Sequence, residues 1–403
     1  MIVPAERQGL SVAHETYLHT KCVVSSLVLT TGLLISPVKL ASNQTTSDPP
    51  SGPAKTQVTP SSSHPFEQIS KQAAQARDQN KSDDAIRLYR EALKLKPSWL
   101  EGWWDLGAIL YEVDRYEEAR DTFRRLANLK PDGGPALAML GLCEFELRDY
   151  ERALHLDRAQ AIGVGHNPEL NSVAQYHMAI LYTRFEQYEA GTKTLFAMAR
   201  MGNETPSLIE ALGLSVLRMP FLPSEMPSDR REMVLMAGRA AYDMRMRRPA
   251  DGEREFEDLI ARYLETPNVH YAYGTFLLNT DAEASLREFN REIQISPGHV
   301  AARLQIAFED IKRADFAAGL PFAEKAVDLA PQLFAAHDAL GRILLGMGET
   351  TRAISELETA VKLAPDSPEV CFALSTAYAR AGRKEDAARL RAEFTRLNSL
   401  RKN

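Results

Sequence analysis

The chain has 403 residues, of which 44% are hydrophobic and 25% are charged, the balance of an ordinary folded protein. Its formal net charge of −6 lacks the basic excess that nucleic-acid-binding proteins usually carry, so no nucleic-acid partner is expected. The three cysteines, Cys22, Cys143 and Cys371, suit neither a disulfide framework nor a zinc site, and the last two are expected to be small buried residues.

An uncharged apolar run, CVVSSLVLTTGLLI, occupies residues 22–35. It is shorter than the roughly 20 residues of a full membrane span and matches the core of a secretory signal. Cleavage after Ala41 would put Lys39 where a small residue is preferred, so two interpretations stay open. Residues 1–41 are a signal peptide, or residues 22–38 are an uncleaved membrane anchor. Both predict an exported protein, periplasmic or extracellular. A third interpretation is a cytosolic protein with a misplaced start.

Residues 42–65 are dominated by Ser, Thr and Pro and contain almost nothing apolar. Such a segment cannot bury enough surface to offset the entropy lost on ordering. It is predicted to be a disordered linker between the apolar run and the folded part.

From Phe66 onward, prolines recur with a fixed spacing. Pro97 and Pro131 are 34 residues apart, and so are Pro297 and Pro331, and Pro331 and Pro365. Proline ends a helix because it lacks an N–H and clashes with the preceding turn. Small residues recur 24 and 12 positions before these prolines, namely Ala73 and Ala85, Gly107 and Ala119, Ala307 and Gly319, and Gly341 and Ala353. This pattern predicts pairs of antiparallel helices that approach closely where neither carries a large side chain.

The segments WWDLGAILYEVDRYEEARDTFRRLANLKP (103–131) and LGRILLGMGETTRAISELETAVKLAP (340–365) resemble the tetratricopeptide repeat family. The resemblance implies an all-α fold, an α-solenoid (right-handed superhelix) of about nine or ten helix-turn-helix repeats. N-terminal repeats are expected over residues 66–205 and C-terminal repeats with a capping helix over 268–403. Between them, residues 206–267 are expected to form two irregular helical hairpins around a proline-rich loop at 219–229, with helical patterns at Ser207–Arg218 and Arg230–Arg247.

In this family the first helix of each pair lines the concave face, so the resemblance also implies a groove for a protein or peptide partner. The inward positions are then Trp104, Tyr111, Met139, Tyr176, Arg184, Tyr271, Phe308, Arg342, Phe372 and Arg380. Aromatic residues and arginine are enriched at protein interfaces, although each of these residues could instead pack against a neighbouring repeat. Trp104 is the best candidate, because Trp103 already takes the packing position. Ser70 and Ala74 stand where some family members bind a C-terminal carboxylate through Lys and Asn, which argues against that subtype.

No catalytic residue, metal or cofactor is expected. His155, His166 and His177 recur every eleven residues, but Gly163 and Pro168 break any shared helix. Four methionines (Met219, Met226, Met233 and Met236) are read as core filling and not as copper ligands. The leading hypothesis is a scaffold that binds a protein or peptide, with self-association through the terminal repeats also possible. The alternative is an enzyme or metal-carrying domain built on residues 206–267.

Overall fold

The computed structural model describes residues 65–165, 167–202, 204–246 and 248–400. The predicted signal peptide or anchor and nearly all of the predicted linker lie outside these residues and stay predictions. Over the described ranges, no helix combines the length and the apolar character that a membrane crossing requires.

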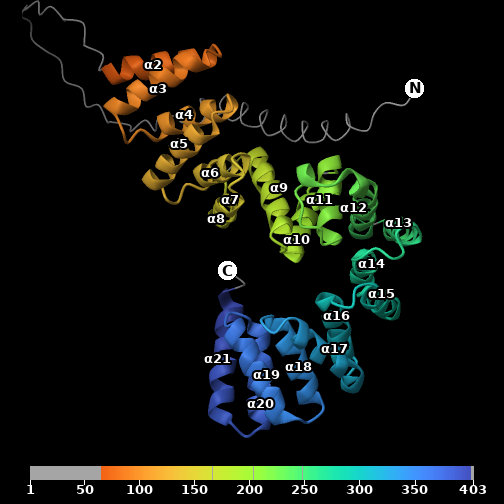
Figure 1. Cartoon of the computed structure of the whole chain (residues 1–403). Helices are drawn as coiled ribbons and strands as arrows, with labels where there is room; N and C mark the ends of the chain where they lie inside the picture. Colours follow the sequence, from red (N-terminus) through yellow and green to blue (C-terminus); the bar gives the residue numbers. More distant parts are fainter. Residues whose placement is uncertain (1–64, 166, 203, 247, 401–403) are drawn as a thin grey trace, which may run out of the picture. The chain divides into compact units, whose positions relative to one another are not determined.

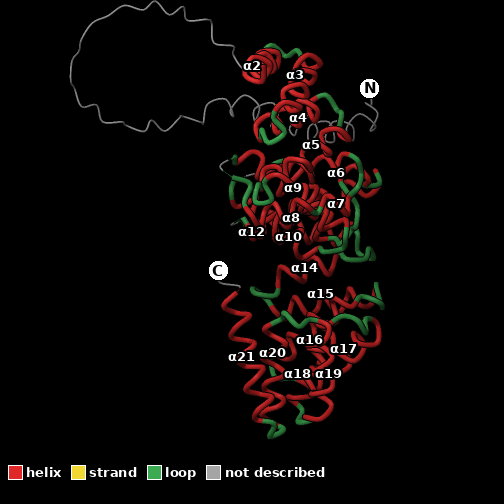
Figure 2. The backbone as a smooth tube through the Cα atoms, turned by 90° about the vertical axis from the view of Figure 1, so that its left-hand side faces the viewer, coloured by secondary structure: helices red, strands yellow, loops and turns green. Residues whose placement is uncertain are grey.

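The described residues form helices joined by short turns, with no strand among them (Figures 1 and 2). This confirms the all-α solenoid prediction. The chain divides into two compact units, one of residues 65–215 with 219–230 and the other of residues 216–218 with 231–400.

The first unit consists mainly of helical hairpins. They are α2 (Pro65–Asp78) with α3 (Ser82–Leu95), α4 (Leu100–Glu112) with α5 (Tyr116–Leu129), α6 (Gly134–Glu146) with the short α7 (Tyr150–Ala153) and α8 (His155–Ile162), and α9 (Pro168–Arg184) with α10 (Tyr188–Arg200). Helix α11 (Pro206–Val216) and two 3-10 turns, η2 (Pro223–Glu225) and η3 (Ser228–Arg230), follow.

The second unit contains five hairpins in succession. They are α12 (Arg231–Arg245) with α13 (Pro249–Arg262), α14 (Val269–Leu277) with α15 (Ala282–Ile295), α16 (Val300–Lys312) with α17 (Phe316–Leu329), α18 (Phe334–Gly346) with α19 (Thr350–Leu363), and α20 (Pro368–Arg380) with α21 (Lys384–Leu400). Only Ala387 and Leu397 of α21 are buried. Most of its other residues are polar or charged, as expected for a helix that caps the last hairpin, although Leu400 is exposed.

The central segment differs from the prediction in one respect. Helices α11 and α12 match the two expected helical patterns closely, and α12 pairs with α13 as an ordinary hairpin. The proline-rich stretch after α11, however, contains the 3-10 turns η2 and η3 in place of the second long helix that another hairpin would need. Closely spaced prolines remove the backbone N–H groups that a continuous helix requires.

The recurring small residues mark the closest approach of paired helices. A Cβ added to Gly107 on α4 would lie 2.8 Å from the ring of Phe123 on α5. One added to Gly341 on α18 would lie 2.5 Å from Leu357 on α19. Phe123 and Leu357 are fully buried, and each contributes on the order of 2 kcal/mol by leaving water. The predicted close packing at these positions is confirmed.

The turns inside the hairpins share a second regularity. The second residue after the first helix has a positive φ, as at Asn80, Asp114 and Ala314, with values of 56°, 62° and 57°. The next N–H then bonds back to the last turn of the helix, for example from Lys81 to the Ala76 carbonyl at 2.9 Å. This left-handed helix ending satisfies carbonyls that would otherwise lack a partner.

Candidate functional site

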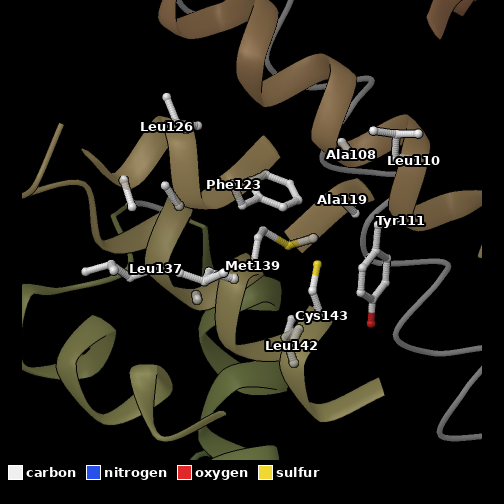
Figure 3. Packing of buried hydrophobic residues seen from close by; sticks show 14 of the residues in the cluster. Ala108, Leu110, Tyr111, Ala119, Phe123, Leu126, Leu137, Met139, Leu142 and Cys143 are labelled. Atoms are coloured by element: carbon white, nitrogen blue, oxygen red, sulfur yellow. The ribbon is translucent and has the colours of Figure 1, made fainter. Parts of the chain in front are cut away.

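Four of the ten predicted groove residues are buried in the hairpin cores. Tyr111 and Met139 are 1% and 0% exposed, and Figure 3 shows both among the packed side chains of α4, α5 and α6. Tyr176 and Tyr271 are buried as well. Burial also raises the pKa of Tyr176, beyond the range in which it would ionise. For these four residues the expectation of a partner-facing side chain is corrected, because aromatic and apolar residues at helical spacing are satisfied by core contacts.

Trp104 occupies an intermediate position. Its ring packs edge-on against Phe123, with centroids 5.6 Å apart, and the side chain is half-buried. Its indole Nε1 is buried and donates no hydrogen bond to the described residues. Burying a donor without an acceptor is unfavourable, so this N–H is an uncompensated polar group inside the hairpin.

Arg184 contacts the chain's own proline-rich segment. Its guanidinium Nε lies 3.2 Å from Oε2 of Glu225 in η2. Leu222, just before η2, is buried. The proline-rich segment is therefore held to the end of α9 by a charged contact, and Arg184 serves this packing.

In the second unit, the first helices of the hairpins carry exposed aromatic side chains. Phe334 on α18 and Phe372 on α20 are 37% and 47% exposed. Phe372 packs against Phe394 of α21 with ring centroids 5.2 Å apart. Phe308 on α16 is half-buried. Exposed aromatic rings on successive repeats are the residues that most often anchor a protein partner.

A pocket of about 590 Å³ is lined by two of these rings, Phe308 and Phe334. Its walls come from α16, from the start of α18, from the turn between α19 and α20, and from the start of α20. Apolar lining residues include Phe308, Phe334, Leu363, Pro365 and Val370. We call this the acidic pocket, because its lining also includes the carboxylates of Asp338, Asp366 and Glu369 and no basic side chain.

Asp338 is the unusual member of this lining. It is 5% exposed, and its Oδ1 accepts no hydrogen bond from the described residues. The Nε of Arg342, one helical turn along α18, lies 3.6 Å from Oδ1, too far for a hydrogen bond. Burial raises the pKa of Asp338, the charge of Arg342 opposes that rise, and the charge of Glu369 adds to it. The negative charge of Asp338 is therefore only partly offset by its surroundings.

The last predicted groove residue, Arg380, is exposed but linked to the preceding repeat. Its Nη1 donates a hydrogen bond of 2.7 Å to the carbonyl of Leu345, near the end of α18. Cations near a helix C-terminus are favourable, so Arg380 helps to join α18 and α20. Both arginines therefore make intramolecular contacts, Arg380 with Leu345 and Arg342 with Asp338.

Sequence reasoning missed Asp338 and Phe334. Asp338 stands three residues before the small residue Gly341, the same offset at which Trp104 precedes Gly107 and Phe372 precedes Ser375. A carboxylate at a position that carries an aromatic ring in other repeats, such as these two, could have pointed to this site. Phe334 lies at the start of α18, one turn before Asp338, and its exposure could not be read from helical spacing alone.

The other residues considered for chemistry have structural roles. Cys143 and Cys371 are free and buried, as expected. His155 Nδ1 lies 2.7 Å from the buried carboxylate of Glu144, and His177 is itself buried beside Phe145. Across the described ranges, no group of three or more His, Cys, Asp or Glu side chains is arranged to hold a metal ion.

The repeated hairpins, their close-packed small residues and their left-handed turns define a helical repeat protein. Residues 71–134 and 339–393 match the family model described as Tetratricopeptide repeat. In these two regions the chain carries repeats of the tetratricopeptide type.

Among curated proteins, the chain is similar to "Cellulose synthase 2 operon protein C" of Komagataeibacter xylinus, at 29% identity over 393 residues. The match covers 82% of this chain and 30% of that protein. Since the chain spans less than a third of the relative's length, the role of the whole relative is not carried over.

Several solved structures are also similar. MamA from Desulfovibrio magneticus RS-1 shares 22% identity with a TM-score of 0.37, over 42% of this chain and 96% of that one. A chain of the APC/C hetero-tetramer Cut9–Hcn1 shares 12% identity with a TM-score of 0.36, over 82% of this chain and 66% of that one. Yeast Tom70 shares 14% with a TM-score of 0.32, over 82% and 92%. Similarity at this level carries no conclusion about function.

Proposed function

We propose that this chain is a scaffold that binds a protein or peptide partner along the first helices of its hairpins. The observation that supports this most strongly is the pair of exposed rings, Phe334 and Phe372, on successive first helices, of which Phe334 lines the acidic pocket. A monomer gains nothing in stability from exposing such rings, whereas an interface core is built from them. Tetratricopeptide repeats are a fold class generally used for binding and not for catalysis.

The partner-facing residues on this proposal are Phe308, Phe334 and Phe372 of the second unit and Trp104 of the first. Trp104 offers the exposed part of its half-buried ring, and the three phenylalanines offer apolar surface. Arg342 and Arg380 lie on the same first helices, and their intramolecular contacts hold neighbouring groups in place.

The proposal extends to location. The apolar run at residues 22–35 has the length and lack of charge of an export signal. We infer that the repeats bind their partner outside the cytoplasm, either as a released protein or as one held by an uncleaved anchor.

Affinity capture with matched variants tests the scaffold function. The full chain, Phe334→Ala, Phe372→Ala and Leu329→Ala are each used to retain proteins from the extract of cells that produce this chain. Leu329 is 39% exposed, close to the exposure of Phe334, but lies on a second helix, α17. Proteins retained by the wild type and by Leu329→Ala, and lost with both phenylalanine variants, are the expected result. Retention that all three variants share with the wild type would overturn the proposal.

A further inference from the structure

The acidic pocket has the composition of a site for a long cationic side chain. Its apolar walls include Phe308, Phe334 and Val370, which suit an aliphatic stem. Its carboxylates, Asp338, Asp366 and Glu369, suit a positive head group. An anionic group would meet repulsion from all three carboxylates, with no basic side chain in the lining to offset it.

The buried carboxylate of Asp338 points to a ligand independently of this composition. A carboxylate that is 95% shielded from water normally accepts several hydrogen bonds, yet Oδ1 of Asp338 accepts none from the described residues. Arg342 contributes charge from 3.6 Å but not a hydrogen bond. By contrast, the neighbouring carboxylate of Glu369 accepts a hydrogen bond of 3.1 Å from the Ser367 hydroxyl.

We propose that the acidic pocket binds an arginine side chain carried by an extended segment of a protein partner, an inference that rests on the scaffold function proposed above. A guanidinium group carries five N–H donors in a plane. It can donate hydrogen bonds to a carboxylate and stack on a phenylalanine ring at the same time. A lysine ammonium supplies charge but not the planar stacking surface. The exposed ring of Phe372 on the next first helix then offers an apolar contact for a neighbouring residue of the same segment.

The pocket volume is consistent with this occupant. About 590 Å³ is ample for one arginine side chain together with part of the backbone that carries it.

The test uses two fluorescein-labelled, end-blocked nonapeptides of alanine and leucine that differ only at the central residue. One carries arginine and the other citrulline, which has the same shape but no charge. Fluorescence anisotropy gives the Kd of each for the full chain. The expected result is that the arginine peptide binds wild type at least about tenfold more tightly than the citrulline peptide, the ratio that a shielded charge-assisted pair supports.

Three variants test whether the acidic pocket is responsible for the preference for the arginine peptide. Asp338→Asn keeps the shape of the side chain and should reduce the ratio to below about threefold, and Glu369→Gln should reduce it by a smaller factor. Asp328→Asn is the control, because Asp328 is an exposed carboxylate on α17 outside the pocket and its loss changes the net charge equally. It should leave the ratio unchanged. Circular dichroism of each variant checks folding.

Equal affinity for the two peptides, no binding of either, or an arginine preference that survives both Asp338→Asn and Glu369→Gln would overturn the arginine site. These outcomes differ from failure of the scaffold function. If the captured proteins depend on Phe334 and Phe372 but the peptides show no charge preference, the scaffold stands and the arginine site falls. If the peptides show the preference but no captured protein depends on the phenylalanines, the arginine site stands and the scaffold function falls.

Discussion

The carboxylate of Asp338 and the guanidinium of Arg342 face each other across one turn of α18, with Oδ1 and Nε 3.6 Å apart. Asp338 is buried, whereas Arg342 is partly exposed. The pair therefore combines a carboxylate that has lost its hydration with a cation that keeps part of its own. Such a pair is not an efficient way to stabilise a helix, because desolvation of the acid offsets the attraction.

Replacing Arg342 tests how far its charge stabilises the buried carboxylate of Asp338. Arg342→Met removes the charge that holds down the pKa of Asp338 and should lower the free energy of unfolding by about 1 kcal/mol at pH 7. The pKa of Asp338 already lies above 3.8 and would rise further in this variant. Protonation then relieves the burial of charge, so the loss should shrink as the pH falls toward that pKa.

Urea denaturation at pH 7 and at about pH 4 measures the effect. The control is the same substitution in an Asp338→Asn background, where no buried charge is left and the loss at pH 7 should be smaller. An equal loss in both backgrounds would show that Arg342 acts through packing and not through Asp338.

Gly107 should tolerate no side chain. Gly107→Ala would place a Cβ 2.8 Å from the ring of Phe123, which is fully buried and cannot move away freely. We expect a loss of about 1 to 3 kcal/mol, the usual effect of overpacking a core. Gly298→Ala is the matched control, since a Cβ there meets nothing within 4 Å. Equal thermal midpoints for the two variants would contradict the close approach of α4 and α5.

The left-handed turns predict a stabilising change. Ala314 has φ of +57°, a conformation that disfavours residues with a Cβ and that glycine adopts freely. Ala314→Gly should therefore raise the free energy of unfolding by about 0.5 to 1 kcal/mol. Gly348 occupies the equivalent place in the next hairpin with φ of +87°, and Gly348→Ala should lower it by a similar amount. Opposite signs in guanidinium denaturation support the turn geometry, and a loss in both variants would count against it.

His177 should make the chain less stable in mild acid. Burial lowers its pKa from 6.5 to about 4, so the folded state resists a proton that the unfolded state accepts. The stability from keeping this ring neutral is present above pH 6.5 and is lost as the pH falls toward 4. At pH 5 the loss is on the order of 2 kcal/mol.

Thermal denaturation of His177→Gln at pH 7.5 and pH 5 tests this, and the variant should lose less stability than wild type on acidification. His155→Gln gives the contrast. A hydrogen bond to Glu144 raises the pKa of His155, so that residue adds stability below pH 6.5 that disappears as the pH rises through its folded pKa. If both variants respond to pH as wild type does, other groups control the acid stability.

Most of the fold could be predicted from the sequence because the same hairpin pattern recurs along the chain. The spacing of the prolines and of small residues such as Gly107 and Gly341 follows from where two helices must touch and end. The proline-rich stretch after α11 was less predictable. Its 3-10 turns depend on contacts such as the one between Arg184 and Glu225, which are distant in sequence.

The candidate site was harder to predict than the fold. The register taken from the family resemblance placed Tyr111 and Tyr271 on the partner-facing side, whereas both are buried. On a helix that is covered by neighbours on several sides, periodicity identifies a face but not which face stays open. Phe372, by contrast, is exposed. The place of Asp338 in a binding pocket could not be predicted, because residues of α16, α18 and α20 form that pocket together.

The most direct test of the scaffold function is photo-crosslinking from defined positions of the full chain in its own cells. A benzophenone amino acid replaces Phe334, Phe372 or, as the control, Leu329, which is exposed on a second helix. We predict that Phe334 and Phe372 yield the same crosslinked protein and that Leu329 does not. Identical crosslinks from all three positions, or none from the two phenylalanine positions, would contradict binding along the first helices.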